Sequence, residues 1–173
     1  MEKLDNLDLR ILNVITEDAR RTHKEIAEQC GVSRAAVYQH VQRMEKNGII
    51  TGSGYRINPR AIGYSTCTYV GITLEKGNMY HKVAAALERI SEIVECHCTT
   101  GSYTMLVKLY SRDNSHLMDL LSNKIQGIEG VISTETLISL DQTIDREIPI
   151  PMPQDAPRVE RRGRKPRAKN DKQ

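Results

Sequence analysis

The first fifty residues carry apolar side chains at the three-to-four-residue spacing of amphipathic helices. The first helix is predicted to begin at Asp5, and its apolar side consists of Leu7, Ile11, Leu12 and Ile15. The second begins at the capping box Thr22–Glu25 and ends at Gly31, a residue suited to a left-handed helix end. Ser33 caps the third, whose buried stripe consists of Val37, Val41 and Met44. This succession predicts a helix-turn-helix unit, and residues 49–57 after it predict a small hairpin, or wing.

From residue 66 onward, the pattern predicts strands separated by helices. Strands are expected over residues 66–74, 93–98, 103–110 and 131–140, with helices beginning near Asn78 and at Asp113 or Ser115. The order strand, helix, strand, strand, helix, strand is that of a ferredoxin-like sandwich. We therefore predict an α+β chain with a winged helix-turn-helix domain over residues 1–60 and a ferredoxin-like βαββαβ domain over residues 61–150. A Pro-spaced, basic and disordered tail is expected over residues 151–173.

Charge is divided unevenly along the 173 residues. The net charge of +3 is the sum of +2 over residues 1–60, −5 over residues 61–157 and +6 over residues 158–173. A basic beginning and a very basic end indicate a polyanionic partner at both ends of the chain. There is neither a signal-peptide pattern nor an apolar run of membrane-spanning length, so we expect a soluble cytoplasmic protein, associated with the nucleoid.

The four cysteines do not predict a metal centre. None of Cys30, Cys67, Cys96 and Cys98 forms a CxxC pair, and a chain of this size needs no disulfide to fold. The segment Cys96-His97-Cys98 is instead typical of a strand, because Cys96 and Cys98 alternate on one face. We therefore expect no metal, no cofactor and a reducing compartment.

The outward side of the third predicted helix is suited to DNA. Small residues near its start allow close approach to the duplex, and Gln and Arg side chains offer donors to bases or phosphates. The candidate contacts in this domain are Ser33, Arg34, Ala35, Ala36, Tyr38, Gln39, Gln42, Arg43 and Arg56. The alternative is an ordinary solvated helix face, and the predicted wing favours DNA binding over it.

These residues resemble the Lrp/AsnC (feast/famine) family of transcription regulators over about residues 1–150. The match rests on Leu4-Asp5, Asp8, Ile11-Leu12, Asp18-Ala19-Arg20, Glu25-Ile26-Ala27, Ser33, Val37, Arg43-Met44-Glu45, Gly48-Ile49-Ile50, Gly52, Ile57-Asn58-Pro59 and Ile62-Gly63. Two positions depart from it: His40 stands where the family usually has arginine, and Ser53 replaces a usual aromatic residue. The first departure weakens a backbone contact or makes it pH-dependent, and the second concerns wing packing.

The resemblance implies that the second domain binds an amino acid or a related small molecule and forms homodimers, with octamers as an alternative. The implied effector residues are Thr99, Thr100, Gly101, Ser102, Tyr103, Thr104, Thr134 and Thr136. Thr104 stands where the family has an aspartate. A threonine hydroxyl can only hydrogen-bond a ligand ammonium group, whereas a carboxylate pairs with it electrostatically. This change puts the family's usual mode of ligand binding in question. The structural alternative is that Gly101 only serves a turn and the threonines only favour strands.

The tail supplies a further set of candidate DNA contacts. Arg162, Gly163, Arg164, Lys165 and Arg167 resemble an AT-hook, except that Lys165 separates Arg164 from the proline. Such a segment can lie in the narrow minor groove of A·T-rich DNA. The alternative is a nonspecific basic arm that acts through counterion release.

Three functions compete on these observations. The main prediction is a sequence-specific DNA-binding regulator whose paired recognition helices reach two half-sites, under control of an amino acid. An architectural A·T-rich DNA binder with little effector control is motivated by the tail and Thr104. An enzyme resembling siroheme decarboxylases is the third, with His97, His81 or Tyr103 near a substrate. We expect no enzyme, because the sequence has no paired carboxylates, nucleophile–base spacing or phosphate loop.

Overall fold

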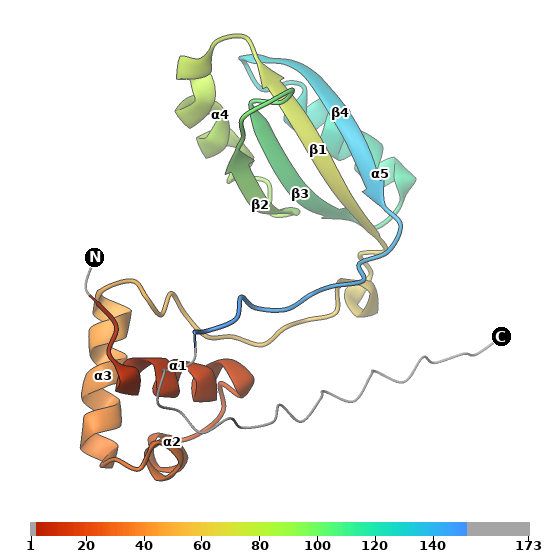
Figure 1. The fold of residues 1–173 in the computed structure, drawn as a ribbon. Coiled ribbons are helices and arrows are strands. Elements are labelled where there is room, and N and C mark those ends of the chain that lie inside the picture. The colour runs from red at the N-terminus through yellow and green to blue at the C-terminus, as the bar shows by residue number, and fades with distance from the viewer. Residues whose placement is uncertain (1–2, 152–173) are drawn as a thin grey trace, which may run out of the picture. The chain divides into compact units, whose positions relative to one another are not determined.

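The computed structural model describes residues 3–151, which form two compact units (Figure 1). One unit comprises residues 3–54 together with residues 146–151, and the other comprises Tyr55–Asp145. The basic segment predicted to bind DNA lies outside the described residues. Within residues 3–151, no helix is both long and apolar enough to cross a membrane.

The first unit contains the three predicted helices, α1 (Asn6–Glu17), α2 (His23–Cys30) and α3 (Arg34–Lys46). Each predicted cap is confirmed. The Asp5 carboxylate accepts from the Asp8 N–H, and the Thr22 and Ser33 hydroxyls accept from Glu25 and Ala36 N–H groups. These bonds satisfy donors that a helix start otherwise leaves free. The left-handed Gly31 then turns the chain from α2 into α3.

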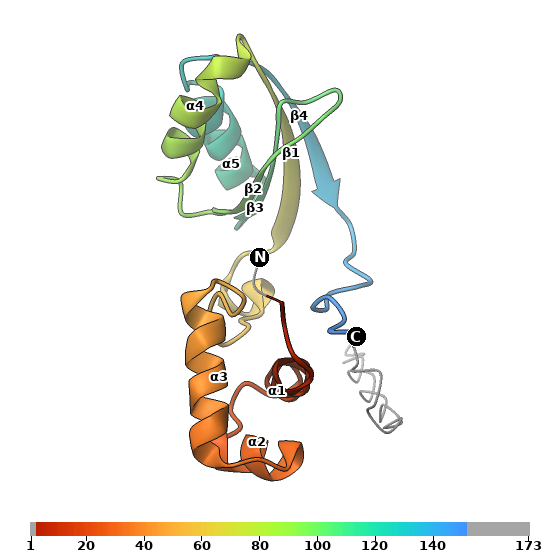
Figure 2. The same ribbon diagram turned by 60° about the vertical axis from the view of Figure 1, so that its left-hand side comes forward.

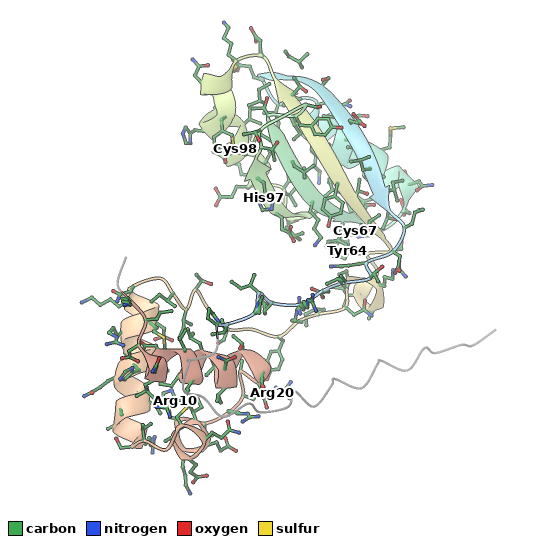
Figure 3. The ribbon with its side chains drawn as sticks, in the orientation of Figure 1. Arg10, Arg20, Tyr64, Cys67, His97 and Cys98 are labelled. Atoms are coloured by element: carbon green, nitrogen blue, oxygen red, sulfur yellow. The ribbon has the colours of Figure 1, made fainter. Side chains whose placement is uncertain are left out.

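A small apolar core holds these helices together. It consists of Ile11, Leu12, Ile26, Ala27, Cys30, Val37 and Met44, all buried. Arg10, labelled in Figure 3, donates from Nη1 to the Cys30 carbonyl at 3.3 Å and so ties α1 to the end of α2. The burial of one stripe from each helix positions α3 with its other side outward.

The predicted wing hairpin does not form. Residues 51–58 contain no strand, and Tyr55 and Ile57 are 79% and 62% exposed. A two-stranded hairpin without an apolar face to bury is marginal in water, and Gly52 and Gly54 add no side chain to such a face. This segment instead leads to a short 3₁₀ turn at Pro59–Ile62.

The second unit is a four-stranded antiparallel sheet with helices against one face (Figure 2). Its strands are β1 (Thr66–Leu74), β2 (Ile93–Cys98), β3 (Met105–Ser111) and β4 (Val131–Ser139), in the spatial order β2-β3-β1-β4. Helix α4 (Tyr80–Leu87) joins β1 to β2, and α5 (Asn114–Asp119) lies between β3 and β4. This arrangement confirms the predicted ferredoxin-like βαββαβ fold.

Three local details differ from the prediction. Asn78 does not cap α4, because it lies in a 3₁₀ turn, Gly77–Met79, that precedes the helix. The third strand begins at Met105 rather than at residue 103, because Tyr103 turns onto the sheet. The helix capped by Asp113 continues as a π-helical turn over Leu120–Ile125.

Strand alternation divides the sheet into a buried face and an open face. Val70 and Ile72 of β1, with Val107 and Leu109 of β3, point into the core beneath the helices and are fully buried. The opposite face carries Tyr69, Leu106, Lys108, Tyr110 and Leu137. Within this unit, α4 and α5 lie against the core face, and neither covers the second face (Figure 2).

Candidate DNA interface and ligand-binding domain

Helix α3 separates an apolar side from an exposed polar side. Val37 and Met44 are fully buried, whereas the predicted contacts Ser33, Arg34, Ala35, Tyr38, Gln39 and Gln42 are exposed and Ala36 is half-buried. The Tyr38 side chain is 53% exposed despite its size. The helix therefore presents one continuous face of small, amide, aromatic and basic residues to solvent.

Two residues that sequence reasoning missed lie beside this face. His23 and Lys24, at the start of α2, line a shallow cavity together with Thr22 and Arg34. The His23 ring meets the Tyr38 ring edge-on, with 5.9 Å between centroids. The sequence signal for these two residues was a His-Lys pair directly after the Thr22 cap. Only the packing of α2 against α3 brings this pair close to Arg34.

The predicted contact Arg43 is engaged with a buried carboxylate of α1. Asp8 is 1% exposed, and Arg43 Nη2 donates to its two oxygens at 2.7 and 2.6 Å. His40 Nδ1 lies 2.7 Å from the same carboxylate, and the Asp5 N–H donates to it at 3.0 Å. Since an ionised carboxylate only accepts, the proton of the His40 ring lies on Nδ1.

This cluster keeps Asp8 ionised. Burial by itself would raise the pKa of Asp8, but hydrogen bonds from Asp5, His40 and Arg43, together with the Arg43 charge, hold that pKa below its ordinary value. Asp5, Asp8 and His40 also lie close enough together to share a metal ion. Arg43 already supplies a cation to this group, so the chain balances the buried charge with its own guanidinium.

The remaining predicted contact of the first domain lies elsewhere. Arg56 forms an ion pair with Asp145, and both residues belong to the second unit. The two side chains are more than half exposed, so this pair contributes little to stability. It does join the segment that enters the second unit to the segment that leaves it.

Hydrogen bonds within the predicted effector loop and to strand β1 hold this loop in place. The Thr99 hydroxyl donates to the Tyr103 carbonyl at 2.8 Å, and the Thr104 N–H donates to the Ile72 carbonyl at 2.9 Å. The Thr104 hydroxyl accepts from the Leu74 N–H at 3.4 Å. Thr100, Gly101 and Ser102 form the exposed tip between these anchors.

Tyr103 lies flat over the open face of the sheet. A Cβ atom on Gly71 would stand only 2.5 Å from Tyr103 Cγ, so the absence of a side chain at this position allows the ring to rest on β1. The Tyr103 hydroxyl donates a hydrogen bond to the carboxylate of Glu135. Glu135 is the β4 residue directly opposite Gly71. This bond raises the pKa of Tyr103. Sequence reasoning missed Glu135, which only the strand register brings to the loop.

Thr134 and Thr136 lie on the other face of β4. Their partners in β1 are Ile72 and Val70, whose side chains enter the core. The Thr134 hydroxyl accepts from Gln126 Nε2 at 2.8 Å. The predicted effector residues therefore fall into two groups separated by β1, and only Tyr103 reaches across it.

Cys96, His97 and Cys98 do not form a combined site. His97 and Cys98 follow one another on β2 (Figure 3), and the register pairs Cys96 with the buried Val107 but His97 with Leu106. The thiol of Cys96 and the imidazole therefore point to opposite faces. Burial raises the pKa of the Cys96 thiol, which disfavours the nucleophilic thiolate.

Comparisons with known proteins agree with this arrangement. Residues 4–51 match the family of winged helix-turn-helix DNA-binding domains, and residues 67–149 match the Lrp/AsnC ligand binding domain. The chain is 40% identical over 148 residues to the regulatory protein AsnC of Haemophilus influenzae, which covers 86% of this chain and 99% of that protein. It is 34% identical over 139 residues to the transcriptional regulator LrpA of Pyrococcus horikoshii, covering 80% and 98%.

Solved structures show the same two-part chain. The structure of Escherichia coli AsnC superposes with a TM-score of 0.79 at 38% identity, covering 85% of this chain and 99% of that one. A feast or famine regulatory protein of Mycobacterium tuberculosis, complexed with L-methionine, gives 0.80 at 30% identity, covering 86% and 100%. The fold and the two family matches thus define a transcription regulator with a helix-turn-helix domain and a ligand-binding domain. The chain belongs to the Lrp/AsnC family.

We predict that Asp8→Asn lowers the free energy of unfolding by about 2 kcal/mol, because an amide accepts more weakly from His40 and Arg43 than a carboxylate does. The lowered pKa of folded Asp8 means that its contribution to stability is present above the unfolded pKa and is lost as the pH falls through the folded pKa. Urea unfolding at neutral pH and at decreasing acidic pH measures both effects.

Glu17→Gln is the matched control for this experiment, because Glu17 is 70% exposed on the same helix and only forms a surface pair with Arg21 at 3.7 Å. It should change stability by less than about 0.5 kcal/mol. Equal unfolding free energies of the two variants across the pH series would show that the Asp8 cluster stabilises the domain no more than a surface ion pair does.

We also predict that Gly71→Ala displaces Tyr103 from the sheet and costs about 1–3 kcal/mol in unfolding free energy, because the new methyl group overlaps the ring. Thermal or urea unfolding measures the cost. Combining Gly71→Ala with Tyr103→Ala should remove most of it, since the clashing ring is then absent. An undiminished cost in the double variant would contradict the proposed contact.

Proposed function

We propose that this regulator binds operator DNA as a symmetric homodimer, with octamers as the alternative assembly, and that α3 enters the major groove. The exposed polar side of α3, opposite its buried stripe, is the observation that carries this proposal. The two recognition helices of a dimer would reach half-sites about one helical turn, or a multiple of it, apart.

The individual contacts have distinct proposed roles. Gln39 and Gln42 read base edges, while Ser33, Ala35 and Ala36 allow close approach of the helix start. Arg34, extended by His23 and Lys24, supports contacts to the phosphate backbone. Arg43 acts mainly by positioning α3, because its guanidinium is bound to Asp8.

The second domain is proposed to bind an amino acid at the loop 99–104 and the strand β4. The relative from M. tuberculosis that carries L-methionine supports this ligand class. The Thr104 hydroxyl accepts from the Leu74 N–H, so its capacity toward a ligand is partly used. Glu135 is exposed and accepts a hydrogen bond from Tyr103, so its carboxylate lies beside the loop, where it is proposed to be available to a ligand.

The open face of the sheet supports a second copy of the chain as partner. Tyr69, Tyr110 and Lys108 are only half-buried there, and Leu137 is 47% exposed. Burial of such a face between two copies would remove apolar area from water in a symmetric, self-complementary contact.

The basic segment 158–173 is proposed to add contacts to DNA, either as a minor-groove hook or as a phosphate-binding arm. Its net charge of +6 supports binding to a polyanion. We propose that the protein works by binding alone, without catalysis, in the cytoplasm on the bacterial-type nucleoid. A set of relatives that are all transcription regulators supports a non-enzymatic role.

We predict that Gln39→Ala and Gln42→Ala each lower the discrimination between the duplex upstream of the protein's own gene and a random duplex. The expected loss is about 1–3 kcal/mol per residue, because each amide contacts a base edge. Equilibrium titrations at a fixed moderate salt concentration measure it, and affinity for the random duplex should stay within about twofold.

Gln29→Ala is the control, since Gln29 is an exposed glutamine of α2 that hydrogen-bonds Arg21 away from the α3 face. It should leave discrimination unchanged. A wild-type protein that binds the two duplexes equally would overturn the proposal of a sequence-specific regulator, and would favour an architectural DNA binder.

We further predict that at least one of the twenty amino acids changes operator affinity or assembly state by fivefold or more, a coupling of about 1 kcal/mol. Titrations with each amino acid, followed by DNA binding and sedimentation, measure the effect. Tyr103→Phe should weaken it, because that variant loses only the bond to Glu135. No response to any amino acid would contradict the proposed ligand class.

A further inference from the structure

Two exposed cysteines lie on one face of strand β2, at an edge of the sheet. Cys96 and Cys98 are both free thiols, and β2 is an outermost strand in the order β2-β3-β1-β4. In the register with β3, Cys96 lies opposite Val107 and Cys98 lies opposite Met105, and both of these partners are fully buried. The two thiols therefore share the core face of the sheet, at its solvent-accessible edge.

The two thiols are close enough to interact electrostatically. Desolvation raises the pKa of Cys96, and the negative charge of a Cys98 thiolate raises that pKa further. Two neighbouring thiolates repel one another, because like charges disfavour each other's ionised form. A cation held between the two sulfur atoms would remove this repulsion, so the pair favours a positively charged partner.

The spacing of Cys96 and Cys98 favours a bridging ion over a disulfide. Residues two apart in a strand have Cα atoms about 6.6 Å apart, close to the upper limit of about 6.8 Å for a disulfide. Their Cα–Cβ bonds also point the same way, so the Cβ atoms stay well beyond the separation of about 3.8 Å that a disulfide needs. Two metal–sulfur bonds of about 2.3 Å on opposite sides of one ion span about 4.6 Å, and staggered rotamers can bring the sulfurs to that separation.

Within the described residues, no third His, Cys, Asp or Glu side chain completes a three-ligand group with this pair. The three such side chains whose ligand atoms lie within 4.8 Å of one another are Asp5, Asp8 and His40, in the first unit. His97, between the two cysteines, faces the opposite side of β2. Zinc needs about four ligands, so the pair does not suit zinc, whereas thiolates suit soft ions such as Cu(I) that accept two sulfur ligands.

We propose that Cys96 and Cys98 form a two-thiolate site for a soft, two-coordinate cation of the Cu(I) class. The ion displaces one proton from each thiol and forms one bond to each sulfur, and no electron is transferred. The exposed edge of β2 admits the ion, while the buried Val107 and Met105 place apolar side chains beside it. This ligand differs in kind from the proposed amino acid, and its binding does not depend on operator binding.

The two-thiolate site lies at the base of the loop 99–104. Cys98 is the last residue of β2 (Figure 3), and Thr99 follows it directly. The Thr99 N–H donates to the Thr104 carbonyl at 3.1 Å, and the Thr99 hydroxyl donates to the Tyr103 carbonyl at 2.8 Å. An ion bound to both cysteines fixes the backbone up to this point, so it should slow the opening of the loop's hydrogen bonds.

Anaerobic titration of the reduced full-length protein with Cu(I), in competition with a chromophoric Cu(I) chelator, measures stoichiometry and affinity. Wild type is compared with Cys96→Ser, Cys98→Ser, Cys67→Ser and His97→Ala. Cys67→Ser is the matched control for loss of a thiol, because Cys67 is a half-buried cysteine on β1. His97→Ala tests whether the imidazole contributes. Circular dichroism and thermal unfolding establish that each variant is folded.

We expect one Cu(I) per wild-type chain and a loss of affinity of about a hundredfold in Cys96→Ser and in Cys98→Ser. Loss of even a partner that orients a metal ligand costs about 10–100-fold, and here the ligand itself is removed. Cys67→Ser and His97→Ala should bind Cu(I) as wild type does. Unchanged affinity in either ligand variant, an equal loss in either control, or one ion per two chains overturns the proposed site.

Amide hydrogen exchange, followed by mass spectrometry, locates the bound ion. Cu(I) should slow exchange in the segment 96–104 of wild type and leave exchange there unchanged in Cys98→Ser. Protection confined to other segments of the chain overturns the placement on β2.

Discussion

The carboxylate of Asp8 carries much of the geometry of the DNA-binding unit. It is nearly inaccessible to water, closes the capping box of α1, and receives the two side chains that α3 directs toward α1. An unpartnered buried carboxylate would be costly, so loss of His40 or Arg43 would destabilise the domain. The position of α3 therefore depends on this group as well as on the apolar core, and both lie behind the face that is proposed to meet DNA.

The ligand-binding domain depends on a comparable constraint at Gly71. Because β1 has no side chain there, the ring of Tyr103 crosses the strand and its hydroxyl reaches Glu135 on β4. The loop 99–104 is thereby fastened to a strand that is not its neighbour in the sheet. A ligand that moved Tyr103 would disturb the contact between β1, the loop and β4 together, and this offers a route from a small molecule to the open face on which assembly is proposed to depend.

The chain passes between the two units twice, once after Gly54 and once after Asp145. The segment after β4 returns to the three-helix unit through Ile150, at the end of the region that relatives share. Packing of one half-buried isoleucine places residues 146–151 with the three-helix unit.

Helix caps, strand alternation and the order of elements depend on neighbouring residues, and the sequence by itself determined them: Asp5, Thr22 and Ser33 start the helices as predicted. The exposed side of α3 was likewise predictable from its apolar stripe. Residues 4–51 match the winged helix-turn-helix family as predicted, but the hairpin expected over residues 49–57 is absent, because Tyr55 and Ile57 have no surface to pack against and stay exposed. Only the tertiary structure decided that Arg43 binds Asp8, that Glu135 meets Tyr103 and that Ile150 rejoins the first unit. These contacts join residues from 32 to more than 100 positions apart, and local patterns carry no information about such pairs.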